Sequence, residues 1–188
     1  MTHAGDSPLG RHRGAQRGTA LPIMFPEMSG YWLGIKDGDP RAFDMFSRHY
    51  SYKPYADNRR KPGYANRFLI VGPGEKLVLI GNDERALFCW RRFRDASGLD
   101  GVNCSVFRNE SGQPGAALIE EAELFALRRW PDVAQFYTFV NPRQVQGTPP
   151  GSVFIRAGWE CAGYTKVNKL LILVKPALRN AAIAARFL

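Results

Sequence analysis

Residues His49 and Tyr50 form the pair in this chain with the clearest capacity for chemistry. An imidazole can transfer a proton near neutral pH or bind a metal ion, and a neighbouring phenol can take part in hydrogen bonding. His49 is the one histidine between residues 29 and 178, because His3 and His12 precede that range. The alternative is structural: an imidazolium stabilises the negative end of a helix dipole, and Tyr50 can pack in the core. Both interpretations stay open.

Three further residues follow apolar runs and offer polar atoms that could serve catalysis. Glu110 could position a substrate or accept a proton, Asn141 could hydrogen-bond a substrate, and Tyr164 could act as an acid. Each also has a structural alternative. Glu110 can cap the next helix, Asn141 can cap a proline turn, and Tyr164 can pack at the start of a strand.

A basic and aromatic segment, "SYKPYADNRRKPGYANRF", begins at Ser51. Lys and Arg side chains can pair with phosphates, and the tyrosines between them can stack on a displaced base. The chain has 26 Lys and Arg against 17 Asp and Glu, a formal net charge of +9, which favours a polyanionic partner over a plain solvated surface. We therefore expect double-stranded DNA as the partner, contacted by Lys53, Arg59, Arg60, Lys61, Arg67 and Arg143.

The elements that must position these residues can be predicted from apolar patterns. "DPRAFDMFSRHY" predicts a helix with Asp39 as N-cap and Pro40 at its first position, so that His49 lies at its end. Two apolar runs around Gly81-Asn82-Asp83 predict a hairpin in which Gly81 and Asn82 adopt positive φ.

The second half of the chain alternates strands and helices. "GVNCSVFRNE", "QFYTFVNP" and "KLLILVKP" predict strands, and "GSVFIRAGW" predicts a short helix closed by Gly158. A longer helix over "GQPGAALIEEAELFALRRW" should bury Leu118, Ala122 and Phe125 and direct its acidic residues away from that face. Those acidic residues are Glu120, Glu121 and Glu123.

Length and composition predict one domain of ordinary size. Residues 1–28 are expected to form a flexible basic arm, residues 29–178 the domain, and residues 179–188 a C-terminal tail. The chain has no run of 18 apolar residues and no apolar signal-peptide core, so we expect a cytoplasmic protein that does not contact a membrane. A homodimer is compatible with the sequence. Three widely spaced cysteines in apolar settings are expected to be buried thiols rather than zinc ligands: Cys89, Cys104 and Cys161.

Two segments, "NESGQPGAALIEEA" and "FIRAGWECAGY", have the small residues that let a backbone and a helix N-terminus approach a pyrophosphate. From Val102 to Pro176 the chain resembles the GNAT acetyltransferase superfamily, although Pro114 departs from the family's usual Q/R-x-x-G-x-G/A pattern. The resemblance implies an α/β (α+β) GNAT fold, a single mixed, mainly antiparallel central sheet flanked by helices, with acetyl-CoA as cofactor. The cofactor contacts it implies are Val106, Phe107, Ser111, Gly112, Gln113, Gly115, Ala116 and Phe154.

A closer resemblance, carried by "SRHYSYKPY" and "YTFVNPRQV", is to the phage Mom DNA-modification proteins. It implies acetyl-CoA-dependent conversion of adenine in double-stranded DNA to a methylcarbamoyl derivative that resists restriction, in the cytoplasm of a phage host. It also implies that His49 and Tyr50 are catalytic and that His49 binds iron. Asn141 stands where that family has an acidic residue, which places an Asp-dependent metal site in doubt.

Two other functions remain as alternatives. A conventional GNAT N-acetyltransferase acting on a small-molecule or protein amine would use a carboxylate base such as Glu110. A non-catalytic DNA-binding domain would keep only a vestigial acyl-CoA pocket. Binding of acetyl-CoA separates the last function from the other two, and analysis of host DNA nucleosides separates the DNA-modifying enzyme from the conventional one.

Overall fold

The computed structural model describes residues 30–53, 68–94, 99–145 and 149–177. The expected N-terminal arm and C-terminal tail lie outside the described residues, so the domain boundaries remain predictions. The same holds for four of the expected DNA contacts, which fall between residues 54 and 67: Arg59, Arg60, Lys61 and Arg67.

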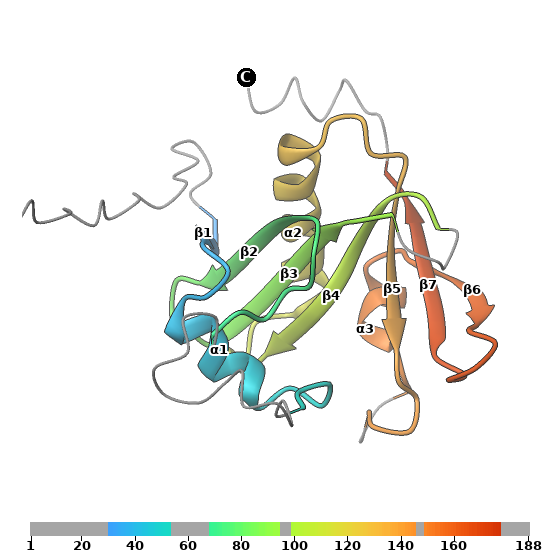
Figure 1. Ribbon diagram of the computed structural model, residues 1–188, viewed down its shortest axis with the longest axis horizontal. Helices are drawn as coiled ribbons and strands as arrows, with labels where there is room; N and C mark the ends of the chain where they lie inside the picture. Colours follow the sequence, from blue (N-terminus) through green and yellow to red (C-terminus); the bar gives the residue numbers. More distant parts are fainter. Residues whose placement is uncertain (1–29, 54–67, 95–98, 146–148, 178–188) are drawn as a thin grey trace, which may run out of the picture.

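One seven-stranded sheet forms the centre of the molecule (Figure 1). Every neighbouring pair of strands is antiparallel except β4 and β5, which are parallel. The expected fold class, a single mixed and mainly antiparallel sheet flanked by helices, is confirmed. In their order across the sheet the strands are β1 (Trp32–Ile35), β2 (Glu75–Gly81), β3 (Ala86–Arg92), β4 (Val102–Asn109), β5 (Gln135–Val140), β7 (Leu171–Pro176) and β6 (Glu160–Tyr164).

The five interior strands were all expected from their apolar runs, whereas the two edge strands, β1 and β6, were not. β1 has only four residues and contains a glycine, and β6 exposes most of its side chains. An edge strand has one neighbour and a short buried face, so its sequence carries little of the apolar signal that marks an interior strand.

The hairpin between β2 and β3 is confirmed, but its turn differs from the expectation. The residue with positive φ is Glu84, at 59°, and neither Gly81 nor Asn82 adopts this conformation. The Glu84 N–H donates to the Gly81 carbonyl over 2.8 Å, and the Asp83 side chain accepts the Arg85 N–H over 2.9 Å. The loop is therefore longer than a two-residue turn, and its left-handed residue comes near its end.

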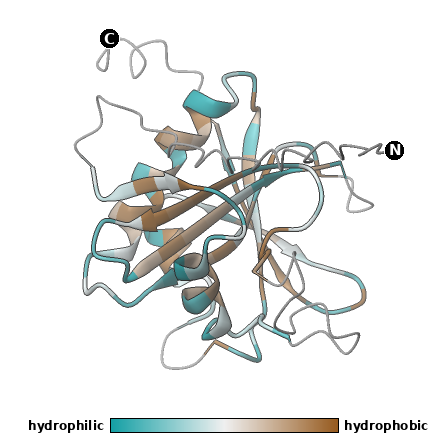
Figure 2. Ribbon diagram, turned by 60° about the vertical axis from the view of Figure 1, so that its left-hand side comes forward, coloured by the Kyte–Doolittle hydropathy of each residue, from teal (hydrophilic) through white to brown (hydrophobic). Residues whose placement is uncertain are grey.

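Helix α1 (Pro40–Ser47) begins as the sequence predicts, with the Asp39 side chain accepting the Arg41 N–H over 2.9 Å. It packs through Met45 and Phe46 onto one face of the sheet. Helices α2 (Gly115–Arg129) and α3 (Ser152–Arg156) lie on the opposite face (Figure 1). The central strands, which lie between α1 and these two helices, are largely apolar (Figure 2). The sheet therefore separates a small core beneath α1 from a larger one beneath α2 and α3.

Tryptophans tie α2 to the sheet in the larger core. The indole N–H of Trp32 donates to the Leu118 carbonyl and that of Trp90 to the Ala122 carbonyl, each over 2.9 Å. These bonds satisfy buried polar atoms that would otherwise cost free energy. The fully buried aromatic residues here include Trp130, Trp159, Phe125 and Phe136.

Glu123 corrects the expected orientation of the α2 carboxylates. Its side chain is buried, where it accepts the indole N–H of Trp159 over 2.7 Å and the ammonium of Lys175 over 2.6 Å. Burial raises its pKa above the ordinary value, although both partners oppose that shift. Glu120 is exposed, as expected.

The cysteines follow the prediction only in part. Cys89 and Cys104 are buried free thiols, and burial raises the pKa of each. Cys161 is exposed, because it lies on the edge strand β6 that the sequence did not reveal. No helix among the described residues is long and apolar enough to cross a membrane.

Candidate active site

The candidate site lies where β4 and β5 separate. The two strands pair over three residues only, Val102–Cys104 with Phe136–Thr138, and then diverge toward their carboxyl ends (Figure 1). The Thr138 hydroxyl donates to the Cys104 carbonyl over 2.8 Å at the last of these pairs. A cavity of about 640 Å³ opens in the wedge beyond it, lined by residues of both strands, of α3 and of the segment after α1.

A β-bulge at Ser105 decides which side chains face each side of the wedge. Cys89 pairs with Val106 while Trp90 pairs with Cys104, so Ser105 is an extra residue in β4. Because side chains alternate along a strand, the extra residue reverses the alternation beyond it. Val106 accordingly packs in the core beneath α1, and Phe107 packs against the core beneath α2 and α3.

Small residues bring α2 and α3 together on one side of the cavity. A Cβ atom on Gly115, the first residue of α2, would lie 2.7 Å from Val153 Cγ2. Gly151 enters α3 with φ 77°, and a Cβ there would lie 2.6 Å from Leu173 Cδ1. The Phe107 and Phe154 rings meet edge to face at 6.0 Å and form an apolar wall. Gly115, Phe107 and Phe154 all line the cavity beside the start of α2.

Asn109 shapes the loop before α2. Its amide donates to the Gln113 carbonyl over 2.8 Å and its oxygen accepts both the N–H and the hydroxyl of Ser111. Gly112 adopts φ 80° within this loop. In the described structure no side chain caps α2, so the first backbone N–H groups of the helix are free to bind an anion.

His49 lies just beyond α1 and lines the other side of the cavity. Its Nδ1 is 2.7 Å from the Ser51 hydroxyl and accepts the Ser51 N–H over 3.2 Å, which places the ring proton on Nε2. Burial, with a contribution from the positive charge of Arg108, lowers the pKa of His49 to about 4. The imidazole is therefore neutral near neutral pH, which removes the helix-dipole role considered from the sequence.

The Tyr50 ring lies beside that of His49, with ring centroids 4.3 Å apart and ring planes tilted by 33°, and Tyr50 also lines the cavity. Burial raises its pKa, and a hydrogen bond from the backbone of Asn141 partly offsets that effect. Tyr50 thereby connects the end of α1 with the end of β5 across the wedge. Its hydroxyl remains protonated near neutral pH and can act as a hydrogen-bond donor.

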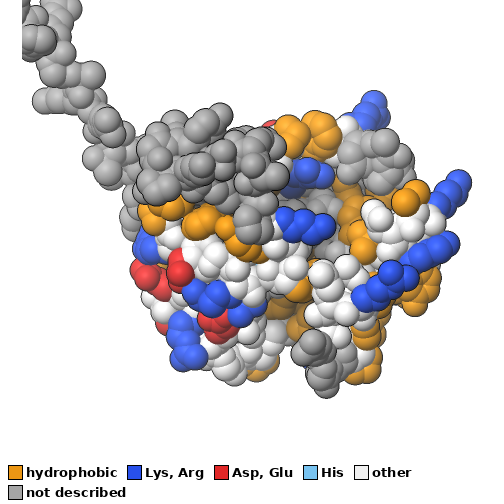
Figure 3. Space-filling model, turned by 60° about the horizontal axis from the view of Figure 1, so that its bottom comes forward, with side chains coloured by type: hydrophobic (Ala, Val, Ile, Leu, Met, Phe, Trp, Pro, Cys, Tyr) orange, Lys and Arg blue, Asp and Glu red, His pale blue; other side chains and the backbone are white. Residues whose placement is uncertain are grey.

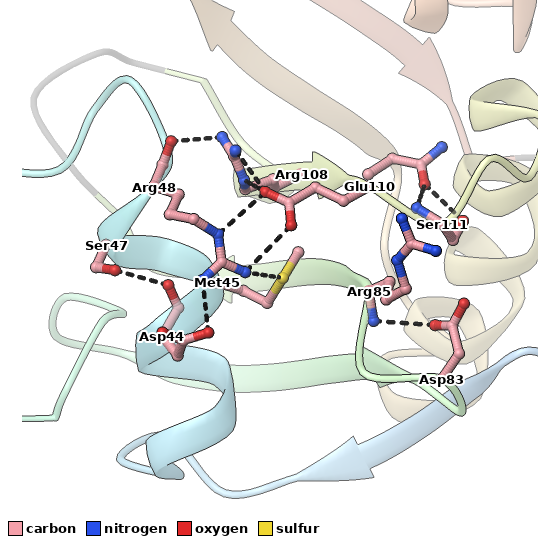
Figure 4. Close-up of polar contacts among 10 residues, drawn as sticks. Asp44, Met45, Ser47, Arg48, Asp83, Arg85, Arg108, Glu110 and Ser111 are labelled. Atoms are coloured by element: carbon pink, nitrogen blue, oxygen red, sulfur yellow. Dashed lines mark hydrogen bonds and ion pairs between the residues drawn. The ribbon is translucent and has the colours of Figure 1, made fainter.

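Arg48 and Arg108 converge on Glu110 (Figure 4). Arg48 donates to both carboxylate oxygens at 3.1 Å, and Arg108 Nε donates to one of them at 2.5 Å. Arg108 also donates to the Arg48 carbonyl. Hydrogen bonds from Arg48, reinforced by Arg108, hold the pKa of Glu110 below its ordinary value, which makes Glu110 a weak proton acceptor.

The structure gathers one part of the predicted site around the cavity. Six predicted residues line it, and four others lie in the loop before α2 and its first turn. The lining residues are His49, Tyr50, Val106, Phe107, Gly115 and Phe154, and the adjoining ones are Ser111, Gly112, Gln113 and Ala116.

The other predicted residues lie elsewhere. Asn141 caps a turn, because its side-chain oxygen accepts the Arg143 N–H over 3.0 Å. Tyr164 is 60% exposed on the edge strand β6 and does not line the cavity. Lys53 and Arg143 are exposed, and Lys and Arg side chains are spread over this end of the molecule, whereas acidic ones gather mainly at the left (Figure 3).

Sequence reasoning missed several lining residues, including Arg48, Arg108, Phe139 and Arg156. Arg48 follows Asp44 by four residues, a spacing that indicates an ion pair on a helix, and the two side chains do form one at 2.5 Å. Arg108 had no such signal, because the bulge that sets its side of the sheet leaves no mark in the apolar pattern.

The expected iron site finds no support in the described residues, where no three potential His, Cys, Asp or Glu ligands lie together. His49 is the nearest candidate, but Ser51 occupies its Nδ1.

No protein-family model and no curated protein matches the chain. Among solved structures, two of the aminoglycoside acetyltransferase AAC(6')-Ib are similar to it. The complex with coenzyme A has a TM-score of 0.42 at 17% identity, over 57% of this chain and 70% of the other. The complex with coenzyme A and kanamycin has a TM-score of 0.42 at 18% identity, over 57% of this chain and 71% of the other.

Proposed function

We propose that the protein is an acyltransferase that binds acetyl-CoA at the wedge between β4 and β5 and acetylates an amine. The observation that carries this proposal is the separation of the two strands beyond Cys104 and Thr138, directly beside the uncapped start of α2. A parallel pair that stays joined would fill this space with its own hydrogen bonds. The separation leaves backbone groups and a cavity where a linear ligand can lie.

The residues present fit acetyl-CoA. The free N–H groups at the start of α2 suit a pyrophosphate, and the absent side chain of Gly115 keeps that approach open. Phe107 and Phe154 offer apolar surface to the pantetheine arm. When bound, acetyl-CoA supplies an activated thioester. The N–H groups of Ser111 and Gln113 already bond within the loop, so Gly112, Gly115 and Ala116 are the better phosphate contacts.

Acceptor chemistry belongs to the side of the wedge that faces α1. There, the protein presents the neutral imidazole of His49, the hydroxyl of Tyr50 and the half-buried ring of Phe139. Among the described residues no carboxylate lines the cavity, and Glu110 is held in its ion pairs. The site therefore favours an acceptor amine that is already uncharged near neutral pH, because such an amine needs no strong base.

Adenine in double-stranded DNA is the second candidate acceptor. Its exocyclic amine is uncharged near neutral pH, and an extruded base needs aromatic surfaces such as those of Tyr50 and Phe139. The basic character of the chain and the arginines at the cavity also favour a nucleic-acid acceptor. The methylcarbamoyl group that the resemblance to Mom proteins implies contains a nitrogen that acetyl-CoA does not carry. The step we propose for this candidate is therefore acetyl transfer, in which the amine forms a bond to the thioester carbonyl carbon and the thiol of coenzyme A leaves.

Acetyl-CoA binding tests the first proposal. Acetyl-CoA should raise the melting temperature, because a ligand bound only by the folded state stabilises it. Gly112→Ala should reduce this shift, whereas Gly163→Ala should not. Both glycines have positive φ and open space around them, but Gly163 lies on β6. Equal shifts in the two variants would remove the loop from the cofactor site.

Mass analysis of DNA nucleosides from cells that express the protein tests the second candidate. A modified adenine should be present with the wild type and absent with His49→Ala or His49→Gln. The glutamine variant preserves much of the buried volume and keeps the test valid if the alanine variant does not fold. Unmodified DNA from the wild type, together with acetylation of a free amine, would leave the conventional acetyltransferase.

A further inference from the structure

The charged residues that line the cavity are all arginines. They are Arg48, Arg108 and Arg156, and no Asp or Glu of the described residues lines it. Two of the three lie on the α1 side: Arg48 follows α1, and Arg108 bonds to it from β4. Arg156 belongs to α3, on the side proposed for the cofactor. All charged side chains that line the acceptor side, among the described residues, are therefore positive.

Arg108 keeps donors free for a ligand. Its Nε and Nη2 contact one oxygen of Glu110 at 2.5 Å, and its Nη1 donates to the Arg48 carbonyl. Counting the described residues alone, these contacts use three of the five N–H donors of a guanidinium, so two remain. Its side chain is 27% exposed, which leaves it accessible from the cavity that it lines.

Glu110 holds the arginines in place without entering the cavity. It is bound by both guanidinium groups but does not itself line the cavity. Arg48 is further fixed by Asp44 at 2.5 Å. Both arginines are thus oriented before a ligand arrives, which reduces the entropy lost when an anion binds.

We propose that the acceptor amine carries an oxyanion, a carboxylate or a phosphate, which Arg108 binds with the support of Arg48. This inference rests on the proposed acyltransferase function and names its substrate class. The planar guanidinium suits either anion because it presents parallel N–H donors. A polycationic acceptor such as kanamycin is disfavoured, since its ammonium groups would face the two arginines without a carboxylate in the lining.

Acetyl transfer to matched acceptors tests the proposal. The full chain is given acetyl-CoA with aniline or 4-aminobenzoate, with 4-aminophenol or 4-aminophenyl phosphate, whose amines are uncharged near neutral pH, and with kanamycin. Transfer efficiency, kcat/KM, should be about tenfold or more higher for the anionic member of a pair. Deoxyadenosine, its 5′-phosphate and an adenine-containing duplex form a further set, which distinguishes a small phosphate acceptor from nucleic acid.

Two variants should shift KM in opposite directions. Arg108→Gln removes the anion contact and should raise KM for the anionic acceptors about tenfold. Glu110→Gln removes a nearby negative charge but keeps an amide oxygen that can still accept hydrogen bonds from the arginines, and should therefore lower this KM. Both substitutions break the same ion pair, so damage to the structure alone would raise KM in each. Arg92→Gln is the control, because Arg92 pairs with Asp132 at 2.6 Å and does not line the cavity.

The outcomes separate this inference from the proposed function. A clear preference for anionic acceptors, with the opposite shifts in KM, supports it. Equal or better transfer to neutral or polycationic acceptors overturns it and leaves the acyltransferase function intact. Binding of acetyl-CoA without transfer to any of these acceptors also counts against the anionic acceptor, and leaves acetyl-CoA binding by the protein in place. Failure to bind acetyl-CoA overturns the function and the inference together.

Discussion

The indole N–H of Trp159 donates to the buried carboxylate of Glu123 over 2.7 Å, and this bond joins the segment after α3 to the middle of α2. Lys175 of β7 completes the group by donating to the other carboxylate oxygen and to the Ala157 carbonyl. One wall of the cavity is formed by α3, whose last turn is held by these contacts. The position of that wall therefore depends on a polar cluster in the larger core.

Replacing Glu123 with alanine should destabilise the protein by about 3 kcal/mol, because it leaves the Lys175 ammonium without its partner in a mostly buried setting. Urea unfolding measures the change. Glu120→Ala, at an exposed position of the same helix, is the control and should have little effect. A double variant, Glu123→Gln with Lys175→Met, should lose less than Glu123→Ala. Equal losses would show that the charge on Lys175 is not the cause.

His49 should make stability fall in acid. Its pKa drops from 6.5 to about 4 on folding, so below pH 6.5 the unfolded chain binds a proton that the folded chain does not. The stability that this neutral imidazole contributes is full above 6.5 and decreases as the pH falls toward about 4, a loss of about 3 kcal/mol. The free energy of unfolding, measured at a series of pH values for the wild type and for His49→Gln, isolates the contribution of His49. A constant difference between the two proteins would contradict the neutral state.

Gly115→Ala should destabilise the protein by about 1 to 3 kcal/mol and weaken acetyl-CoA binding, since its new methyl group meets Val153 Cγ2 at 2.7 Å. Val153→Ala removes that contact. The double variant should recover part of the stability, so that the two changes are non-additive. Thermal melts with and without acetyl-CoA measure both effects. Simple additivity would indicate that α3 moves away freely.

Tyr50→Phe should lower kcat for acetyl transfer about 100-fold while leaving the KM for acetyl-CoA unchanged. Tyr50 lines the cavity on the side proposed for the acceptor, and the ring alone is enough for packing beside His49. Tyr164→Phe is the matched control, because Tyr164 is exposed on β6 and does not line the cavity. If Tyr164→Phe lost more activity than Tyr50→Phe, the assignment of the acceptor side would be wrong.

Much of the fold can be predicted from local patterns. The Asp39–Pro40 helix start, the hairpin and the interior strands follow from caps and apolar runs that operate within a few residues. The buried state of Glu123 does not, because its partners, Trp159 and Lys175, are 36 and 52 residues away in the chain. The sequence around an acidic residue on a helix does not show that distant residues will form hydrogen bonds with it in the core.

The residues on the side proposed for the cofactor carry more signal in the sequence than those on the side proposed for the acceptor. Gly112 and Gly115 are recognisable because a tight turn and a close approach restrict residue type. Arg48 meets Arg108 and Glu110 only through tertiary folding, because it lies 62 residues from Glu110 in the chain. Lys and Arg in the sequence therefore indicated a polyanionic partner without showing which cations the cavity would use.

The extra residue at Ser105 makes the side of the sheet that each later residue of β4 faces depend on the length of that strand. Insertion or loss of one residue there would exchange the environments of Phe107 and Arg108 in a single step, placing the cation toward the cofactor and the ring toward the acceptor. No point substitution achieves the same exchange. A change of one residue in the length of this strand would thus exchange the two sides of the wedge while leaving the types of all residues beyond it unchanged.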